Sequence, residues 1–182
     1  MDKRKNQLFA VLAVLLAVAI TVVIVVFRKT IQQFGAYGYS GVLLISFLGN
    51  ATVFFPVPSL ALVFAMGSVL NPVLVGLVAG VGEALGELSG YLAGLGGRAI
   101  IEDHQTYEKI NRWMKKFGLW VIFTLSVIPN PIFDLAGIVA GASGFPLWQF
   151  LLYCWMGKTI KTTLIAFAGY YSISLVERLL SL

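Results

Sequence analysis

Four charged residues interrupt stretches of sequence that are otherwise apolar. Glu83 and Glu87 are four residues apart in "GVGEALGELSGY", and Lys158 and Lys161 are three apart in "GKTIKTT". Residues at these spacings share one face of a helix, so each pair offers two like charges to a partner. Together the two pairs can form a purely structural ion-pair network, or they can line a polar or proton-linked path.

A charge near the middle of a bilayer costs roughly 2.5–3.5 kcal/mol on insertion scales, so it normally faces a partner or a water-filled cavity. We therefore expect the two lysines to be the partners of the two glutamates. Further polar residues lie in nearby apolar sequence and can contribute to the same path. The predicted substrate or ion pathway consists of Glu83, Glu87, Asp134, Lys158, Lys161, Asn50 and Asn130.

The composition of the chain places these charges in a membrane protein. Of the 182 residues, 59% are hydrophobic and 12% are charged, whereas soluble domains contain about 25% charged residues. The net charge of +5 lies in loops, which indicates membrane topology and contact with anionic lipids rather than nucleic-acid binding. We predict an all-α integral membrane protein.

The first apolar segment, residues 8–27, is uncharged and long enough to cross a hydrocarbon core of about 30 Å. Arg28 and Lys29 follow it without a small-residue cleavage site, so residues 1–40 are interpreted as a retained transmembrane anchor and a polar connector. Basic residues precede the anchor and recur in 98–116, and the positive-inside bias puts both in the cytoplasm. The expected location is the cell membrane if the organism is prokaryotic, with a cytoplasmic N-terminus.

Two apolar segments, residues 43–70 and 117–144, are broken by prolines in their middle. The breaks contain Pro56, Pro58, Pro129 and Pro131. A proline inside a helix removes a hydrogen bond and costs ~3 kcal/mol or more. Two half-helices that turn at the prolines and leave on the side they entered avoid this cost, and we predict two such re-entrant hairpins. Two kinked helices that span fully are the alternative.

The order of segments repeats once along the chain. Pro58 aligns with Pro131, and Pro72 aligns with Pro146, at offsets of 73 and 74 residues. Each unit is a broken segment followed by a helix that opens on proline, and one full crossing between the units gives them opposite orientations. The predicted membrane domain, 41–172, comprises repeat 1 (about 43–97), an amphipathic surface helix (98–116) and repeat 2 (about 117–171), and a tail (173–182) follows.

Glycines at helical spacing predict surfaces where another backbone approaches closely. Gly82, Gly86, Gly90 and Gly94 recur at every fourth residue and lie on one helical face. Gly137 and Gly141 form a shorter face of the same kind. Such packing is either internal or between subunits, so a homo-oligomer is a possible arrangement.

The sequence offers no enzymatic motif that holds together. Ser143 in "GASG" matches the nucleophile motif of rhomboid proteases, but the one histidine, His104, lies in the basic loop rather than at membrane depth. There is no metal-ligand cluster, phosphate loop or nucleotide fingerprint in the sequence. We therefore predict a protein that is not an enzyme and needs no metal or cofactor, although coupling to protons stays open.

The strings "GEALGELSGY" (82–91) and "IPNPIFDLAGIVAG" (128–141) resemble the DedA family, also called VTT-domain or SNARE-associated Golgi proteins. The resemblance covers roughly residues 40–172 and is strongest to the vacuole-membrane-protein branch. It implies two re-entrant segments that face each other and an activity that moves lipids between leaflets. Bacterial members usually carry an arginine shortly after the proline of the second re-entrant segment. This chain has Asp134 there, and the next arginine after it is Arg178.

The missing arginine would deprive an anionic polyprenyl phosphate of a partner, although Lys158 and Lys161 could substitute. A phospholipid scramblase or flippase is therefore the leading hypothesis, with membrane lipids as the partners and headgroups moving through a polar groove between the re-entrant segments. The first alternative is a proton-coupled flippase or transporter for undecaprenyl phosphate or a small solute. The second is a membrane scaffold that transports nothing.

Overall fold

The computed structural model describes residues 35–51, 59–96, 110, 112–114, 116–129 and 132–180, with side chains from Tyr37 to Ser172 within those ranges. In this part of the chain all regular secondary structure is helical, in agreement with the predicted all-α class. The named helices are α3 (Gly35–Ala51), α4 (Ser59–Gly67), α5 (Pro72–Gly86), α6 (Leu88–Leu95), α8 (Leu119–Val127), α9 (Ile132–Ala142) and α10 (Leu147–Leu180).

Several sequence predictions lie outside the described residues. They are the N-terminal anchor, the prolines Pro56, Pro58 and Pro131, residue Asn130, and the part of the surface helix between 97 and 109. Of the four predicted turn prolines, Pro129 is described, and its side chain is exposed at the end of α8. Re-entrance at the two breaks therefore stays a prediction.

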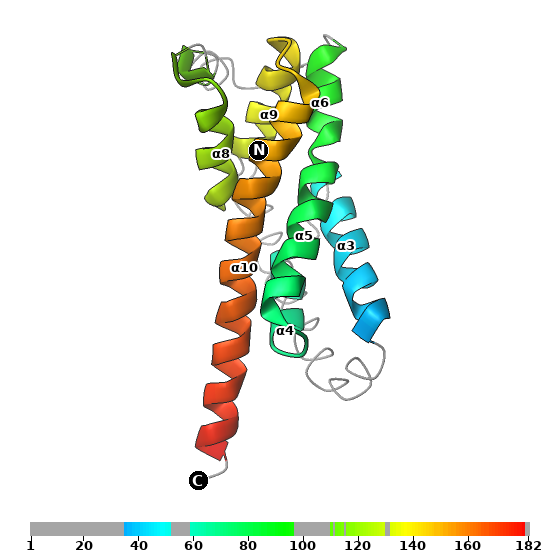
Figure 1. Cartoon of the computed structure of the whole chain (residues 1–182), viewed down its shortest axis with the longest axis vertical. Coiled ribbons are helices and arrows are strands. Elements are labelled where there is room, and N and C mark those ends of the chain that lie inside the picture. The colour runs from blue at the N-terminus through cyan, green and yellow to red at the C-terminus, as the bar shows by residue number, and fades with distance from the viewer. Residues whose placement is uncertain are drawn as a thin grey trace, which may run out of the picture.

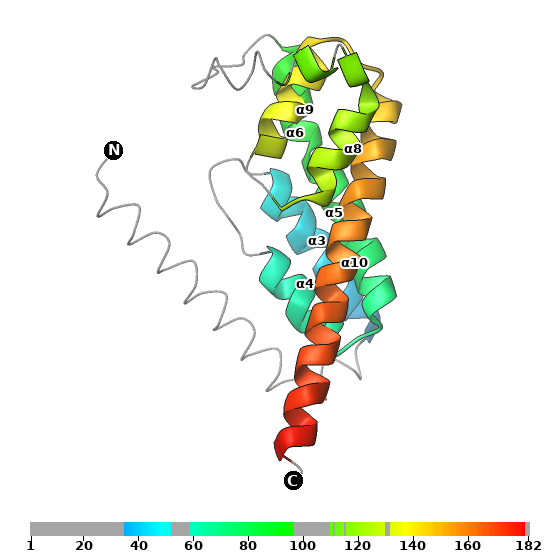
Figure 2. The ribbon, with the colours of Figure 1, turned by 90° about the vertical axis from the view of Figure 1, so that its left-hand side faces the viewer.

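The centre of the molecule is a long antiparallel pair made by α5 with α6 and by α10. Helix α10 packs along α5 and also contacts α4 and α8, while α3 packs on α5 and α9 packs on α6. Figure 1 shows α5 and α6 as a nearly continuous column beside α10, and Figure 2 shows α8 and α9 at the upper end with α4 at the lower end. Each broken segment thus covers a different half of the central pair.

The start of α5 follows from its sequence. The Asn71 side-chain oxygen accepts hydrogen bonds from the N–H groups of Val73 at 3.0 Å and Leu74 at 3.2 Å, and Pro72 occupies the first helical turn as predicted. Asparagine at this position satisfies N–H groups that have no partner within the helix, and proline fits there because it has no N–H. The cap therefore fixes where the central helix begins.

Helices α5 and α6 join at Glu87 with little loss of hydrogen bonding. The Glu87 N–H donates to the Glu83 carbonyl at 3.2 Å, and the Tyr91 N–H donates to the Glu87 carbonyl at 3.1 Å. Together they form a helical unit, Pro72–Leu95, of 24 residues with a mean hydropathy of 1.4 over its most apolar window. Among the described residues it is the one helix that is long and apolar enough to cross a bilayer.

Two separate hydrophobic cores lie at the two ends of the central pair. The lower core gathers side chains from α3, α4, α5 and α10, among them Val42, Val63, Met66, Val75 and Ala166. The upper core gathers side chains from α6, α8, α9 and α10, among them Tyr91, Ile122, Phe133, Phe150 and Cys154. The charged residues of α5 and α10 lie between the two cores along these helices.

Glycines allow the close contacts between the halves and the central pair. A Cβ atom added at Gly82 would lie 2.5 Å from the Leu43 carbonyl oxygen of α3, and one added at Gly157 would lie 2.7 Å from the Phe123 carbonyl oxygen of α8. Likewise Gly67 of α4 abuts Ala166, and Gly141 of α9 abuts Tyr91. A side chain at any of these positions would collide with backbone.

The predicted glycine faces are only partly of this kind. A Cβ atom added at Gly86 would lie 2.6 Å from the Phe47 carbonyl oxygen, and one added at Gly94 would collide with the backbone of Ile138 in α9. At Gly90 and Gly137, in contrast, the nearest atoms would be 3.5 Å and 3.7 Å from an added Cβ, which is ordinary van der Waals contact. Close packing therefore requires glycine at Gly82, Gly86, Gly94 and Gly141 but leaves room at the other two positions.

Candidate functional site

The four charged residues of the central helices converge in the interior. Glu83 of α5 and Glu87 at the α5–α6 junction are 0% and 2% exposed, and Lys158 and Lys161 of α10 are 4% and 8% exposed. Antiparallel packing of α5 on α10 brings the two pairs face to face, and Asn50 of α3 borders them. We call Asn50, Glu83, Glu87, Lys158 and Lys161 the polar cluster.

Lys158 connects most of the polar cluster. Its Nζ atom lies 2.6 Å from Glu87 Oε1 and 3.7 Å from Glu83 Oε2, and it donates a hydrogen bond of 2.9 Å to Asn50 Oδ1. The same ammonium lies 4.6 Å from the centroid of the Phe133 ring, a cation–π contact. One lysine of α10 therefore joins α3, α5, the α5–α6 junction and α9.

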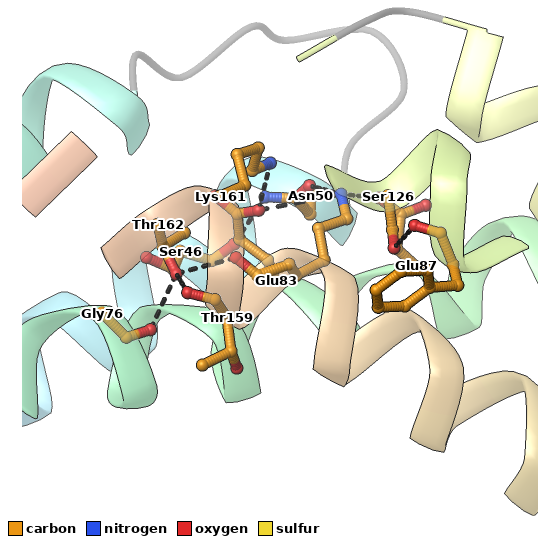
Figure 3. Close-up of polar contacts among 11 residues, drawn as sticks. Ser46, Asn50, Gly76, Glu83, Glu87, Ser126, Thr159, Lys161 and Thr162 are labelled. Atoms are coloured by element: carbon orange, nitrogen blue, oxygen red, sulfur yellow. Dashed lines mark hydrogen bonds and ion pairs between the residues drawn. The ribbon is translucent and has the colours of Figure 1, made fainter. Parts of the chain in front are cut away.

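Lys161 holds the other glutamate. Its Nζ atom lies 2.5 Å from Glu83 Oε2, so this one carboxylate oxygen faces both lysines. The second oxygen, Glu83 Oε1, has no hydrogen-bond donor among the described residues. Figure 3 shows Glu83 between Lys161 on one side and Glu87 on the other. Glu83 therefore retains acceptor capacity in the interior.

Asp134 adds a third carboxylate. It lies in the first turn of α9, is half-buried, and is within electrostatic range of both Lys158 and Lys161. No ion pair joins it to another residue of the described ranges within 4.0 Å. Three carboxylates thus face two amines, and the region has a surplus of acidic groups.

Hydroxyl groups surround the polar cluster and were not predicted. The Thr162 hydroxyl donates to the Gly76 carbonyl at 2.7 Å, and the Asn50 amide donates to the Ser46 carbonyl at 3.0 Å. The buried Ser46 and Thr159 hydroxyl oxygens have no hydrogen-bond partner within the described part of the chain. Figure 3 shows the Thr162 side chain near the charged side chains, whereas the Thr159 side chain points away from them.

Helical spacing could have identified two of these residues. Thr162 is four residues after Lys158 and Ser46 is four residues before Asn50, so each lies on the same helical face as a predicted pathway residue. Phe133 gave no such signal, because an aromatic residue in an apolar segment is ordinary core sequence. Of the predicted pathway residues, Asn50, Glu83, Glu87, Lys158 and Lys161 come together, Asp134 borders them, and Asn130 lies outside the described residues.

This arrangement can bind groups of either sign. The lysines can hold a phosphate, and the carboxylates can hold an amine or a proton, in an interior where charge interactions are stronger than in water. Within the described ranges there is no group of three or more His, Cys, Asp or Glu side chains placed to hold a metal ion. The chemistry that fits the polar cluster is reversible binding of a small charged group.

Comparison with known proteins gives a family match over most of the chain. The family model described as VTT domain matches residues 57–171. Vacuole membrane protein KMS1 of Arabidopsis thaliana is 31% identical over 106 residues, covering 46% of this chain and 26% of that protein. Vacuole membrane protein KMS2 of the same plant is 34% identical over 103 residues, with 46% and 25% covered.

Vacuole membrane protein 1 of Homo sapiens is 30% identical over 104 residues, covering 44% of this chain and 26% of the human protein. The matched region thus spans about a quarter of the length of these curated relatives. No solved structure matches the chain.

Proposed function

Because this chain belongs to the VTT-domain (DedA) family, in its vacuole-membrane-protein-like branch, we propose that it moves phospholipid headgroups between the two leaflets of a membrane. The chain is a helical membrane protein, and the relatives that it matches carry the name vacuole membrane protein. We also propose that the chain lies in a cell membrane with its N-terminus in the cytoplasm.

The observation that carries the proposal is the polar cluster itself. Lys158 and Glu87 form an ion pair of 2.6 Å in the middle of a helix pair whose ends are apolar cores. Replacing a buried ion pair by apolar residues is often neutral or stabilising, so such a pair is weak evidence for a purely structural role. A path for charged headgroups gives the pair a reason to be there.

In the proposed mechanism the headgroup exchanges with contacts that the polar cluster already makes. A lipid phosphate would compete with Glu87 and Asn50 for the Lys158 ammonium, and a headgroup amine would bind the carboxylates released by that exchange. The acyl chains stay in the hydrocarbon throughout. Because scrambling only equilibrates two leaflets, the step consumes no cofactor.

The path would run between two re-entrant segments that form an inverted repeat. Matched glycine contacts support this part of the proposal: Gly82 meets α3 as Gly157 meets α8, at an offset of 75 residues, and Gly67 meets Ala166 as Gly141 meets Tyr91, at offsets of 74 and 75. The helices contacted also correspond: α3 in one half corresponds to α8 in the other, and α10 corresponds to the unit formed by α5 and α6. The turns of both segments would then meet at the polar cluster.

A proton-coupled flippase is the second candidate. The observation that favours it is the surplus of carboxylates, since Glu83 Oε1 has no donor among the described residues and Asp134 has no ion-pair partner there. A carboxylate in that position can take up and release a proton during transport. The substrate would then be undecaprenyl phosphate or a small solute.

One assay separates the two candidates. The purified chain is reconstituted into liposomes that contain a fluorescent phospholipid, and dithionite is added to bleach the outer leaflet, with and without an imposed proton gradient. The scramblase proposal predicts loss of nearly all fluorescence in both conditions. Bleaching that stops near half in both conditions contradicts it. Bleaching beyond half only with the gradient favours proton coupling, and a fluorescent undecaprenyl phosphate in place of the phospholipid tests the substrate of the second candidate.

A further inference from the structure

A second, separate feature lies at the upper end of the molecule, where two helical stretches meet at a sharp turn. Residues 112–114 and 116–117 are helical, and α8 begins two residues later at Leu119. Gly118 makes the turn with φ of 60°, a backbone conformation that residues with a side chain rarely adopt. Its N–H donates to the Met114 carbonyl at 2.8 Å, which closes the first stretch.

The turn opens an apolar groove between the two stretches. The groove has a volume of about 290 Å³, near the lower end of the range for small-molecule pockets. Its lining side chains are Trp113, Phe117, Trp120, Val121, Thr124 and Leu125. The Thr124 hydroxyl donates to the Trp120 carbonyl at 2.8 Å, so the one hydroxyl of this lining already has a hydrogen-bond partner.

Large aromatic surfaces border this groove. Phe117 is 54% exposed and Trp120 is 64% exposed. The Trp120 indole is held in place by edge-to-face contacts with Phe123 at 5.8 Å and Tyr153 at 5.9 Å between ring centroids. The groove wall is therefore an ordered aromatic surface, anchored on α8 and α10, that remains open on one side.

Two cations are next in sequence to residues that line the groove: Arg112 precedes Trp113, and Lys116 precedes Phe117. Arg112 and Lys116 are exposed on the stretch that supplies Trp113 and Phe117, and the Lys116 ammonium lies 5.0 Å from the centroid of the Phe117 ring. An apolar slot with cations at one edge matches a lipid with an anionic headgroup, because the chain can fill the slot while the phosphate meets the cations.

The position in the fold agrees with this chemistry. Figure 2 places the turn before α8 at the same end of the molecule as the turn between α9 and α10, where the exposed Trp148 lies in the first turn of α10. Tryptophan gathers at the boundary between the hydrocarbon and the headgroups. A cationic rim at that level would face the headgroup layer.

We propose that the groove between α8 and the helical residues 112–114 and 116–117 binds one acyl chain of an anionic phospholipid, with Arg112 and Lys116 at its headgroup. This site is separate from the polar cluster: none of its lining residues belongs to that cluster. It would hold a resident lipid beside the protein whether or not lipids cross through the polar cluster. The proposal therefore stands independently of the proposed function.

A second apolar groove in the same chain serves as a control for this site. A smaller groove of about 140 Å³ lies between α5 and α10, lined by Val81, Ala84, Leu85, Leu151 and Trp155. It is apolar and has a tryptophan. Neither groove has a charged lining residue, and the difference is that the exposed Arg112 and Lys116 lie next in sequence to Trp113 and Phe117 of the first groove. Lipid that merely surrounds the protein would contact both grooves alike, whereas a built site would select anionic lipid at the first groove alone.

The test uses tryptophan fluorescence in vesicles of phosphatidylcholine with increasing fractions of brominated phosphatidylglycerol, a quencher carried on the acyl chain. One variant of the full chain, Trp148→Phe with Trp155→Phe, reports on the groove beside α8. The matched control variant, Trp113→Phe with Trp120→Phe, reports on the other tryptophans. Brominated phosphatidylcholine in a phosphatidylglycerol background supplies the reverse measurement.

We expect Trp113 and Trp120 to be quenched by phosphatidylglycerol with an apparent affinity about fivefold or more above that for phosphatidylcholine. Adding Arg112→Gln and Lys116→Gln to the reporter variant should remove the preference, while near-ultraviolet circular dichroism shows that packing is kept. The control variant should show no preference. Equal quenching by both lipids at the groove reporters, or an equal preference in the control, would overturn the proposal.

Discussion

The two halves of the molecule use the same backbone contacts but carry opposite charges at corresponding positions. Gly82 and Gly157 make equivalent contacts with α3 and α8, yet the next residue is Glu83 in one half and Lys158 in the other, 75 positions later. Identical residues there would bring like charges together in the interior. The difference instead produces the contact of 3.7 Å between them.

Backbone contacts and charges are therefore distributed differently over the two halves of the proposed repeat. The glycines and their backbone partners recur because the same helix packing occurs twice. The charged residues differ because they meet in one shared place, where complementarity is needed. A carboxylate and an amine attract strongly in a medium of low dielectric constant, and two like charges would repel as strongly.

The largest effect is expected from removing the charge of one half. Lys158→Met keeps much of the side-chain volume but leaves Glu87 and Glu83 without their shared cation. Breaking one partner out of a buried ion pair costs about 3–5 kcal/mol, so the free energy of unfolding in detergent should fall by that amount. The same change at Lys116, an exposed residue, is the control and should be nearly neutral. Unchanged stability of Lys158→Met would show that the pair contributes nothing to the interior.

A second prediction tests whether the two halves pack alike. Gly82→Ala and Gly157→Ala each place a Cβ atom against a carbonyl oxygen, at 2.5 Å and 2.7 Å. Overpacking of this kind costs about 1–3 kcal/mol, and the two variants should lose similar stability in thermal unfolding. If only one of them is destabilised, the correspondence between the halves fails.

Gly90→Ala is the matched control for these variants. Its added Cβ would have its nearest neighbour at 3.5 Å, and alanine is favoured over glycine within a helix by roughly 0.5–1 kcal/mol. We expect Gly90→Ala to be neutral or slightly stabilising. A loss as large as that of Gly82→Ala would mean that the whole glycine face is closely packed.

A loss of stability smaller than that of Lys158→Met is expected at a position where the two halves differ. Asn71 caps α5 through two hydrogen bonds, whereas the residue 74 positions later, just before α10, is Phe145. Asn71→Ala should cost about 1 kcal/mol, the usual value of a helix cap, while Phe145→Asn should not gain stability in the same way, because Phe145 packs on the upper core. Differential scanning calorimetry of both variants checks this. A stabilised Phe145→Asn protein would show that the two starts are interchangeable.

Much of the site could be predicted from the sequence because charges in apolar helices need partners. The pairing of Glu83 and Glu87 with Lys158 and Lys161 followed from their spacing and number, and the start of α5 followed from Pro72, although its cap, Asn71, was not predicted. The glycine faces were predicted from their spacing of four residues.

Other contacts could not be predicted, because the spacing of residues shows which of them share a helical face but not which helix packs against that face. The Phe133 ring contacts Lys158 only through packing between α9 and α10, whereas the spacing of Ser46 and Thr162 from Asn50 and Lys158 could have indicated that they share a helical face with the polar cluster. The space for a side chain at Gly90 and Gly137 likewise depends on the distance between α6 and α9 at these positions, which the sequence does not give. The N-terminal anchor and the turns at Pro56, Pro58 and Pro131 stay predictions, because they lie outside the described residues.

The central claim, that lipid headgroups use the polar cluster, is tested most directly by a variant that removes charge without breaking the fold. Glu87→Gln combined with Lys158→Met removes the charge of both members of the buried pair at which the proposed exchange takes place, and removing both partners is often tolerated or stabilising. The measurement is the rate of dithionite bleaching in proteoliposomes, with thermal unfolding as the check on folding. The account predicts a folded protein whose bleaching stops near half, as in protein-free liposomes. A folded double variant that scrambles lipid at the rate of the unaltered chain would contradict it.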